Sequence, residues 1–213
     1  MKNAKSSQVK HSSVKNHSRV KQRIGIYSGT FDPVHAGHIA FALQAAKQAK
    51  LDKVYLTPER HPRGKHHVTH YAHRVAMVRR ATRPYRQLDV LELEDKTFSV
   101  TRTLPRLKRR FPNATLVYLC GSDVVRHMKA WPNVGRLLSS AELCVGRRHD
   151  EDIQGLQEIV ARLARPPLAY QIIESQAPGV SSSQVREALR QKRGVQGLLA
   201  SVRAYASQEW LYL

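Results

Sequence analysis

Cysteine is scarce in this chain, which has Cys120 and Cys144 as the two thiols among its 213 residues. Each lies at the end of a short apolar run, so we expect both to be small buried hydrophobes. This usage is atypical of a disulfide-stapled secreted domain and indicates a reducing, cytoplasmic location. Long apolar runs are also lacking, which predicts no transmembrane helix and no membrane partner.

Acidic residues are scarce as well, because 16 Asp and Glu stand against 36 Lys and Arg and give a net charge of +20. Residues 1–23 hold seven of the basic residues, no acid and no apolar centre, so they predict a disordered basic tail and not a secretory signal. Outside the tail the basic residues still exceed the acidic ones by 13. A positive field of this size favours polyanionic ligands, and we expect no dedicated carboxylate cage for a metal.

From residue 24 to residue 213, short apolar strands alternate with helices. We expect strands at 24–28, 54–57, 88–93, 115–120, 143–146 and 170–174. We expect helices at 37–50, 71–82, 98–111, 153–164, 182–191 and 198–207, helical pieces on both sides of Trp131, and Thr69 as the cap of helix 71–82. Strict alternation of strands too apolar to be half-exposed predicts one α/β domain with a doubly wound parallel sheet.

The loop after the first strand reads Gly29-Thr30-Phe31-Asp32-Pro33-Val34-His35-Ala36-Gly37-His38. Ligands of such sheets bind beyond the carboxyl ends of the strands, so this loop is the first candidate site. His35 and His38 lie at the start of the next helix, where free N–H groups and the helix dipole favour an anion. Two imidazoles at this spacing can donate hydrogen bonds to phosphate oxygens. The alternative is that His35 is a loop residue and His38 a helix cap.

This segment resembles the HxGH motif of the nucleotidyltransferase superfamily, and most closely that of the nicotinate/nicotinamide mononucleotide adenylyltransferases. Four further segments resemble motifs of the same family, in the same order. They are 97–104 (TFSVTRTL), Gly121-Ser122-Asp123 with Trp131 eight residues later, Val145-Gly146-Arg147-Arg148, and 180–186 (VSSSQVR). The closing residues 202–212 are also similar to the last helix of the family. Five ordered motifs are far more specific than one.

The resemblance implies a Rossmann-like nucleotidyltransferase fold and an attack by an acceptor phosphate on the α-phosphorus of ATP, with release of pyrophosphate. It implies that His35, His38 and Arg186 are catalytic, by positioning and charge stabilisation. ATP would be bound by Gly29, Thr30, Phe31, Gly37, His38, Gly121, Asp123, Arg148, Ser182, Ser183 and Arg186, and Mg²⁺ would arrive with ATP, held mainly by its phosphates. Helix capping is the plain alternative for Ser181–Ser183 and for Asp123.

The resemblance also implies that a pyridine mononucleotide is the acceptor, bound by Lys65, Ser99 and Trp131, with the Trp131 ring stacked on the pyridine. Two positions depart from the family pattern. Phe98 stands where a tyrosine is usual, and Pro132 stands where bacterial nicotinate-preferring enzymes offer a backbone N–H to the nicotinate carboxylate. The choice between nicotinate and nicotinamide therefore stays open. Phosphopantetheine is the alternative acceptor within the same superfamily.

Two alternatives come from other classes of protein. The net charge and the basic tail fit a nucleic-acid-binding protein on the same fold, and the tail is a candidate for non-specific nucleic-acid contact even in an enzyme. The histidines of the loop after the second strand (His61, His66, His67, His70 and His73) fit a metal-dependent hydrolase, a remote option because neither Cys nor carboxylate accompanies them. We expect a basic, phosphate-facing loop there and no bound metal.

Overall fold

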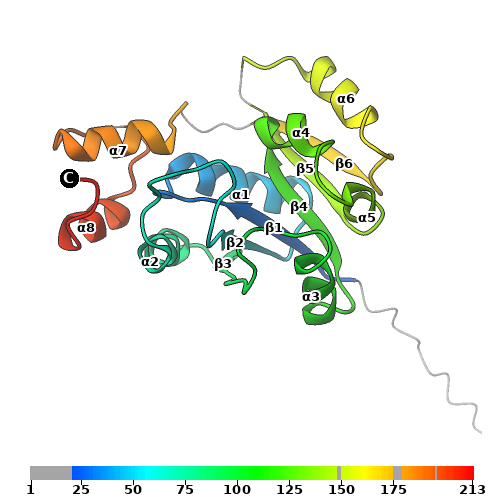
Figure 1. Cartoon of the computed structure of the whole chain (residues 1–213), viewed down its shortest axis with the longest axis horizontal. Helices are drawn as coiled ribbons and strands as arrows, with labels where there is room; N and C mark the ends of the chain where they lie inside the picture. Colours follow the sequence, from blue (N-terminus) through cyan, green and yellow to red (C-terminus); the bar gives the residue numbers. More distant parts are fainter. Residues whose placement is uncertain (1–20, 148–149, 175–178, 195) are drawn as a thin grey trace, which may run out of the picture.

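The computed structural model describes residues 21–147, 150–174, 179–194 and 196–213. Six strands form one fully parallel sheet in the order β3-β2-β1-β4-β5-β6, with helices on both faces (Figure 1). The strands are β1 (Arg23–Gly29), β2 (Lys53–Pro58), β3 (Leu88–Val90), β4 (Thr115–Gly121), β5 (Glu142–Arg147) and β6 (Tyr170–Glu174). The helices are α1 (Ala36–Gln48), α2 (Tyr71–Thr82), α3 (Thr103–Arg110), α4 (Ser122–Met128), α5 (Val134–Leu138), α6 (Ile153–Ala161), α7 (Ser182–Arg190) and α8 (Ala200–Gln208). The predicted doubly wound parallel sheet is confirmed.

Side chains of the central strands alternate between two hydrophobic clusters, one on each face of the sheet. In β4, Leu116, Tyr118 and Cys120 point to a cluster that includes residues of α3, α4, α5 and α6. Val117 and Leu119 point to the opposite cluster, which includes residues of α1, α2 and α8. Because both faces of β4 are covered, its sequence is an unbroken apolar run. That run is the pattern from which a buried parallel strand was predicted.

Both cysteines are free and buried, as expected. Burial raises the pKa of Cys144 to about 12, and it raises that of Cys120 further above the usual range. Both thiols are therefore protonated at neutral pH and serve as core residues. Within the described ranges, no helix has the length and hydrophobicity needed to span a membrane.

The end of β3 and the start of α3 differ from the prediction. The expected strand 88–93 ends at Val90, since the Leu91 N–H makes the last ladder bond, to Leu56 O, and Leu93 O accepts from the Arg60 side chain instead. The expected helix 98–111 begins at Thr103. Before it, the chain forms a turn in which Thr103 Oγ1 accepts from Ser99 N at 2.9 Å and donates to a buried carboxylate, Asp95 Oδ2, at 2.7 Å. Side-chain bonds of this kind compete with helix formation.

Thr69 does not cap α2, although the helix itself has the predicted limits. The N-cap position is His70, without a side-chain cap bond, and Thr69 holds the preceding loop through its backbone. The tail boundary also shifts by one residue. Arg23, expected in the tail, begins β1, and its guanidinium donates to both carboxylate oxygens of Glu142, at 3.0 and 2.7 Å. Residues 1–20, the rest of the predicted tail, lie outside the described residues.

The sheet has its switch point between β1 and β4, where the strand order reverses. The crevice beyond the carboxyl ends of these two strands is the usual ligand site of a doubly wound sheet. The loop of residues 30–35 and α1 follow β1, and α4 follows β4 directly. The topology therefore places the candidate HxGH loop at this crevice.

Candidate active site

His35 and His38 lie face to face at the start of α1, with ring centroids 3.7 Å apart and planes tilted by 32°. His35 is the N-cap residue, and its backbone N–H donates to His38 Nδ1 at 3.2 Å. Because Nδ1 of His38 accepts this bond, the neutral ring carries its proton on Nε2. Phe31 fixes the ring from the side, with centroids 5.0 Å apart at 75°. The fold thus holds His38 as a hydrogen-bond donor through Nε2.

Burial keeps both imidazoles neutral. It lowers the pKa of His35 to about 4, and His35 Nδ1 is buried without a hydrogen-bond partner among the described residues. Burial also lowers the pKa of His38 well below its usual value, and the nearby His35 and Lys65 lower it further. An anion placed against these rings would reverse part of the shift, since opposite charge favours the protonated form. The pair therefore suits a polyanion better than a neutral ligand.

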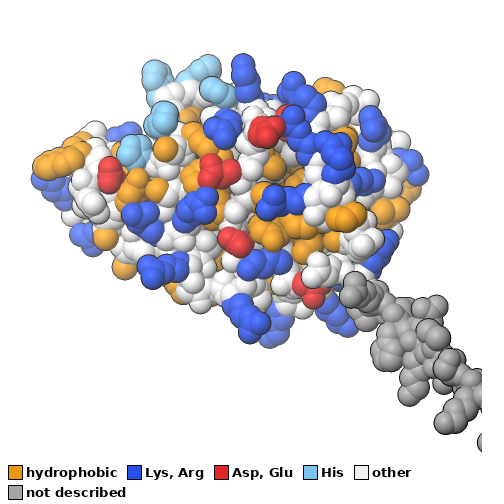
Figure 2. All heavy atoms as spheres, turned by 90° about the horizontal axis from the view of Figure 1, so that it is seen from below, with side chains coloured by type: hydrophobic (Ala, Val, Ile, Leu, Met, Phe, Trp, Pro, Cys, Tyr) orange, Lys and Arg blue, Asp and Glu red, His pale blue; other side chains and the backbone are white. Residues whose placement is uncertain are grey.

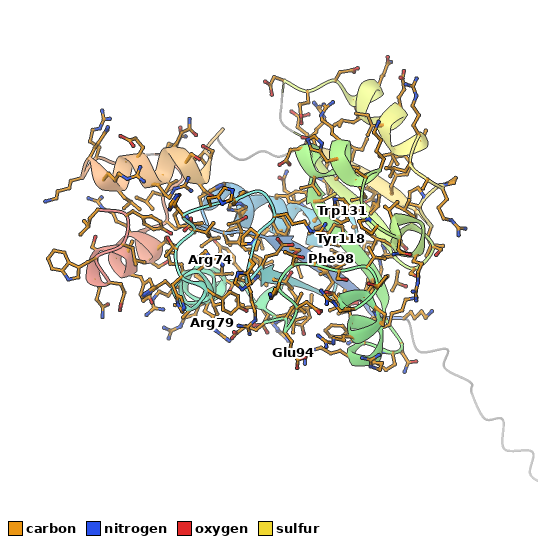
Figure 3. All side chains as sticks on the ribbon, viewed as in Figure 1. Arg74, Arg79, Glu94, Phe98, Tyr118 and Trp131 are labelled. Carbon is orange, nitrogen blue, oxygen red and sulfur yellow. The ribbon has the colours of Figure 1, made fainter. Side chains whose placement is uncertain are left out.

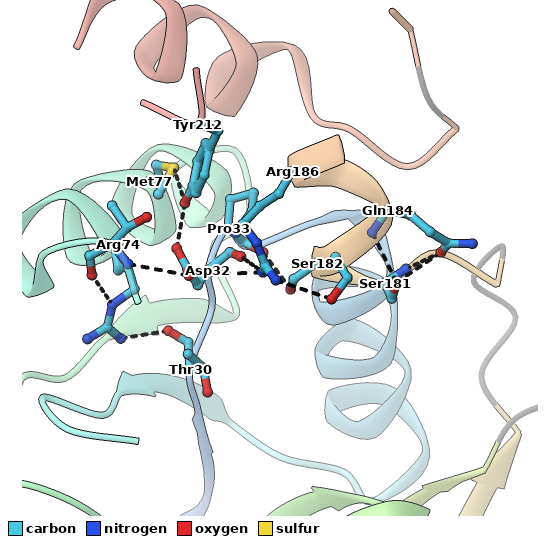
Figure 4. A network of polar contacts seen from close by, with 12 residues as sticks. Thr30, Asp32, Pro33, Arg74, Met77, Ser181, Ser182, Gln184, Arg186 and Tyr212 are labelled. Carbon is cyan, nitrogen blue, oxygen red and sulfur yellow. Dashed lines mark hydrogen bonds and ion pairs between the residues drawn. The ribbon is translucent and has the colours of Figure 1, made fainter. Parts of the chain in front are cut away.

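The start of α7 meets the same loop, although about 145 residues separate them in sequence. Ser182 Oγ donates to Pro33 O at 3.0 Å, and Arg186 Nη1 donates to Asp32 O at 2.7 Å (Figure 4). Arg186 Nη2 also donates to Ser183 Oγ at 3.2 Å. The residues that sequence reasoning selected from both segments, His35, His38, Ser182, Ser183 and Arg186, therefore surround one loop.

Helix capping, the alternative for Ser181–Ser183, applies to Ser181 alone. Ser181 Oγ accepts from Gln184 N at 3.2 Å, and the Gln184 side chain accepts from Ser181 N at 2.8 Å, which completes a capping box. Ser182 and Ser183 are the first two helical residues, whose N–H groups have no partner within the helix. The capping alternative thus does not apply to them, and their N–H groups offer a second anion site.

Asp32 joins three distant parts of the chain, and sequence reasoning assigned it no role. Its carboxylate accepts from Tyr212 OH at 2.7 Å and from Thr69 N at 3.4 Å, while its carbonyl holds Arg186 (Figure 4). The residue is 5% exposed, so these bonds satisfy a buried charge. Its place in the motif, three residues before His35, could have pointed to a role. Its partner Tyr212, however, lies 180 residues away along the chain.

Arg74 is a second buried anchor that the sequence did not reveal. It is 1% exposed, and its guanidinium donates to three carbonyls, Thr69 O at 2.8 Å, Thr30 O at 2.7 Å and Arg60 O at 3.2 Å. Burial lowers its pKa, an effect that Asp32 opposes. One side chain of α2 therefore fixes the loop after β1 against the loop after β2. The available signal was a basic residue on the apolar face of a predicted helix.

Gly29 and Gly121 end the two strands at the switch point, and at each a neighbouring side chain lies close to where a Cβ would be. A Cβ on Gly29 would lie 3.0 Å from the Phe31 ring, and one on Gly121 would lie 2.5 Å from Asp123 Oδ1. Phe31 is 1% exposed, so its side chain supports His38 and does not face solvent. Asp123 is exposed in the first turn of α4, which keeps its carboxylate accessible at the end of β4.

Three aromatic rings, those of Phe98, Tyr118 and Trp131, pack together as one aromatic cluster. Trp131 is half-buried, with its ring centroid 6.0 Å from that of Tyr118 and 6.4 Å from that of Phe98 (Figure 3). Phe98 and Tyr118 are buried below it. Arg63 from the loop after β2 places its guanidinium carbon 5.8 Å from the Trp131 ring centroid. Ser99 follows Phe98 and is half-buried, with its hydroxyl 3.2 Å from that of Thr101.

The remaining predicted residues fall in different places. Lys65 is exposed, and its charge acts on His38. Thr30 offers its carbonyl to Arg74, and Gly37 is in the first turn of α1. Arg147 donates to Glu151 O and is ion-paired with Glu174, so it is not free for a ligand. Arg148 lies outside the described residues.

The donor set does not form a metal cage. Within the described part of the chain, no three His, Cys, Asp or Glu side chains gather as ligands for one ion. Figure 2 shows the histidines at one corner of the molecule, on a face where Lys and Arg are frequent and acidic side chains few. The carboxylate of Asp32 is committed to Tyr212 and Thr69.

A doubly wound sheet with two helix starts and two imidazoles around one loop is the arrangement expected of a nucleotide-binding protein. Residues 26–188 match the model of the cytidylyltransferase-like family. A probable nicotinate-nucleotide adenylyltransferase of Gemmatimonas aurantiaca is 31% identical over 195 residues, which are 89% of this chain and 92% of that protein. The nicotinate-nucleotide adenylyltransferase of Bacillus subtilis is 29% identical over 199 residues, 90% and 98% of the two chains.

Solved structures agree on the fold. Plasmodium falciparum nicotinic acid mononucleotide adenylyltransferase, in structures complexed with APC and with NaAD, covers 90% of this chain and 97% of its own at a TM-score of 0.73, with 18% and 19% identity respectively. The chain is thus a nucleotidyltransferase with a Rossmann-like fold. It belongs to the cytidylyltransferase-like family and, within it, to the nicotinate-nucleotide adenylyltransferases. The resemblance found in the sequence is confirmed.

Proposed function

We propose that this chain transfers the adenylyl group of ATP to nicotinate mononucleotide and releases pyrophosphate, the dinucleotide-forming step of NAD biosynthesis. One observation carries the proposal. The starts of α1 and α7 are joined through Ser182 and Arg186 to the loop that bears His35 and His38. Two helix N-termini and two imidazoles on one loop suit a triphosphate.

The chemistry requires positioning more than proton transfer. A phosphate oxygen of the mononucleotide attacks the α-phosphorus of ATP, the α–β bridging bond breaks, and pyrophosphate leaves with the bonding electron pair. The attacking phosphate is already ionised near neutral pH, because its second pKa is about 6. No protein base is needed, which agrees with two histidines whose pKa values are lowered by burial. The residues must align the two substrates and stabilise charge that develops on the bridging oxygen.

Each group has a role that follows from its position. His38 donates from Nε2 to the triphosphate, and the N–H groups of Ser182 and Ser183 bind its β- and γ-phosphates together with Arg186. Asp123, exposed at the end of β4, accepts the ribose hydroxyls. Mg²⁺ enters as part of the substrate MgATP and supplies further neutralisation of phosphate charge.

The acceptor occupies the other half of the crevice. We propose that its pyridine ring stacks on Trp131, that Lys65 attracts its phosphate toward the side of His38, and that Ser99 contacts the ring substituent. The half-buried ring of Trp131 and the charge that Lys65 exerts on His38 support this placement. A rigid aromatic face binds a planar heterocycle with little loss of conformational entropy.

The test is product formation from MgATP with nicotinate mononucleotide, nicotinamide mononucleotide or phosphopantetheine, separated by chromatography together with the pyrophosphate released. We expect the dinucleotide from the nicotinate substrate. In His38→Ala we expect the rate to fall by roughly 100- to 1,000-fold, the usual loss of one positioned donor to a developing anion. Folded protein with MgATP that makes no dinucleotide would refute the proposal. Product from phosphopantetheine alone would replace the acceptor and keep the reaction class.

Two further parts of the proposal concern the whole chain. The seven basic residues of positions 1–23 suit non-specific contact with nucleic acid, which salt would weaken by competing for the phosphates. The two buried, protonated thiols suit a reducing cytoplasm. Both remain predictions.

A further inference from the structure

Arg63 lies beside the aromatic cluster of Phe98, Tyr118 and Trp131. Its Nη2 donates to Phe98 O at 3.2 Å, and its guanidinium carbon lies 5.8 Å from the ring centroid of Trp131. Sequence reasoning assigned it no role, because it is one of several basic residues in a polar loop. The structure brings it within cation–π distance of the ring on which we place the pyridine.

Among the residues that the structure describes, the charge of Arg63 has no counter-ion. Within the described ranges, no carboxylate lies within 4.0 Å of its guanidinium, and its Nε and Nη1 make no hydrogen bond there. The charge of Arg63 acts on the aromatic cluster. Burial raises the pKa of Tyr118 well above its usual value, and Arg63 opposes that rise. An exposed cation with free donors beside an aromatic cluster suits an anionic group on a planar ring.

The backbone N–H groups beside the aromatic cluster already have hydrogen-bond partners, and one position has no N–H. Phe98 N donates to Glu59 Oε1 at 3.1 Å, Ser99 N donates to Thr103 Oγ1 at 2.9 Å, and Trp131 N donates to Met128 O at 3.0 Å. The next residue, Pro132, has no N–H. A carboxylate carried by a ring on Trp131 would find none of these four positions able to donate. The guanidinium of Arg63 can donate hydrogen bonds to such a carboxylate.

We propose that Arg63 binds the carboxylate of the nicotinate ring and thereby sets a preference for nicotinate over nicotinamide mononucleotide. This inference rests on the proposed function and names the group that reads the acceptor. A guanidinium makes charge-assisted, often bidentate hydrogen bonds to a carboxylate. A carboxamide is neutral and carries its own N–H donors, so it gains much less from the same cation.

Lys65, two residues away, provides the matched control. Its charge lowers the pKa of His38, so it acts at the phosphate end of the crevice, whereas Arg63 acts at the ring end. Both acceptors carry the same phosphate and differ in the ring substituent alone. Loss of the Lys65 charge should therefore lower kcat/KM equally for both mononucleotides. Loss of the Arg63 charge should lower it for nicotinate mononucleotide alone.

The experiment measures kcat/KM for both mononucleotides at saturating MgATP, in wild type, Arg63→Gln, Arg63→Lys and Lys65→Gln. In Arg63→Gln we expect a fall of roughly 10- to 100-fold for the nicotinate substrate, as for loss of a hydrogen bond to a charged group, and no change for the nicotinamide substrate. Arg63→Lys should keep part of the preference, because it keeps the charge but not the planar fork. Lys65→Gln should leave the ratio of the two substrates unchanged.

The ratio is measured within one preparation, so partial unfolding of a variant cancels from it. An equal loss for both substrates in Arg63→Gln would show that Arg63 contributes to general binding and would overturn the inference. A wild type that prefers nicotinamide mononucleotide would overturn it as well. Failure of the proposed function looks different, since wild type would then turn over neither substrate. Tryptophan fluorescence titrations would in that case compare the two affinities directly, and equal affinities in wild type and Arg63→Gln would also contradict the inference.

Discussion

Buried polar side chains hold the phosphate-binding loop at the scale of single residues. Arg74 and Asp32 are 1% and 5% exposed, and each contacts segments that are distant in the sequence. Arg74 donates hydrogen bonds to three carbonyls, and the Asp32 carboxylate accepts them from Tyr212 OH and Thr69 N. Neither side chain faces the crevice as a ligand group. Their contribution is to fix the backbone that presents His35 and His38.

Arg74→Met should destabilise the protein by roughly 2–5 kcal/mol, because it removes a buried side chain that donates to three carbonyls. Arg74→Lys should recover little of this loss, since one ammonium group does not reproduce a fork that reaches three oxygens. The measurement is the free energy of unfolding in denaturant. Arg79→Met is the control on the same helix, because its ion pair with Glu92 is exposed and should contribute less than about 1 kcal/mol. Equal losses for the two variants would contradict this account.

His35 should make stability depend on pH. Burial lowers its pKa in the folded protein to about 4, below the ordinary value of 6.5 in the unfolded chain. Its neutral form therefore stabilises the fold fully above pH 6.5, and this contribution declines as the pH falls toward 4, because the unfolded chain binds the proton first. His35→Gln, which cannot titrate, should gain roughly 1–2 kcal/mol relative to wild type between pH 7 and pH 5. Parallel stability curves for the two proteins would show that burial does not shift this pKa.

Sequence reasoning selected candidate site residues but not the residues that support them. The histidines, the late serines and Arg186 were selected because their types and spacing suit phosphate and resemble a known motif. Arg74, Tyr212 and Arg63 were assigned no role, because a pattern along the chain does not show which distant carbonyl or ring a side chain meets. Phe31 was selected as a nucleotide contact, yet its side chain is buried against His38. Motif membership alone does not distinguish a ligand contact from a packing contact.

At the scale of secondary-structure elements, α7 is tied to the first loop by two side chains from one face of the helix. Arg186 contributes a bond to Asp32 O and a position near the proposed triphosphate. Arg186→Lys should lower kcat/KM for ATP by roughly 10- to 100-fold, because a lysine cannot make the backbone bond and reach a phosphate together. The control is Arg190→Lys one turn further along, where the ion pair with Glu187 is exposed. Equal activity in both variants would place the triphosphate away from α7.

The first and last residues of a helix or strand could be predicted where its apolar periodicity starts and stops at those residues. Helix α2 and strand β6 have the expected limits, and most other elements agree within two or three residues. The largest error, at the start of α3, arose where Thr103 and Asp95 form side-chain bonds that replace a helical turn. The Thr69 cap failed for a similar reason, since its N–H and carbonyl are bound to Asp32 and Arg74. Both errors reflect contacts that local propensity does not contain.

At the scale of the whole molecule, strand order decides where the two helix starts meet. The sequence predicted alternating strands and helices, but the order β3-β2-β1-β4-β5-β6 with its switch between β1 and β4 came from the structure. That switch lies between β1, which leads into the HxGH loop, and β4, which carries Tyr118 of the aromatic cluster. The net charge of +20 adds a positive field that attracts ATP and a mononucleotide alike, without choosing between them.

The most direct test of the central claim is a crystal structure of the protein with Mg²⁺ and a non-hydrolysable ATP analogue. The two joined helix starts predict one triphosphate held from both sides. Its oxygens should lie at about 2.7–3.2 Å from His38 Nε2 and from the N–H groups of Ser182 and Ser183. A triphosphate bound by the start of α1 alone, or in another crevice of the molecule, would contradict the account.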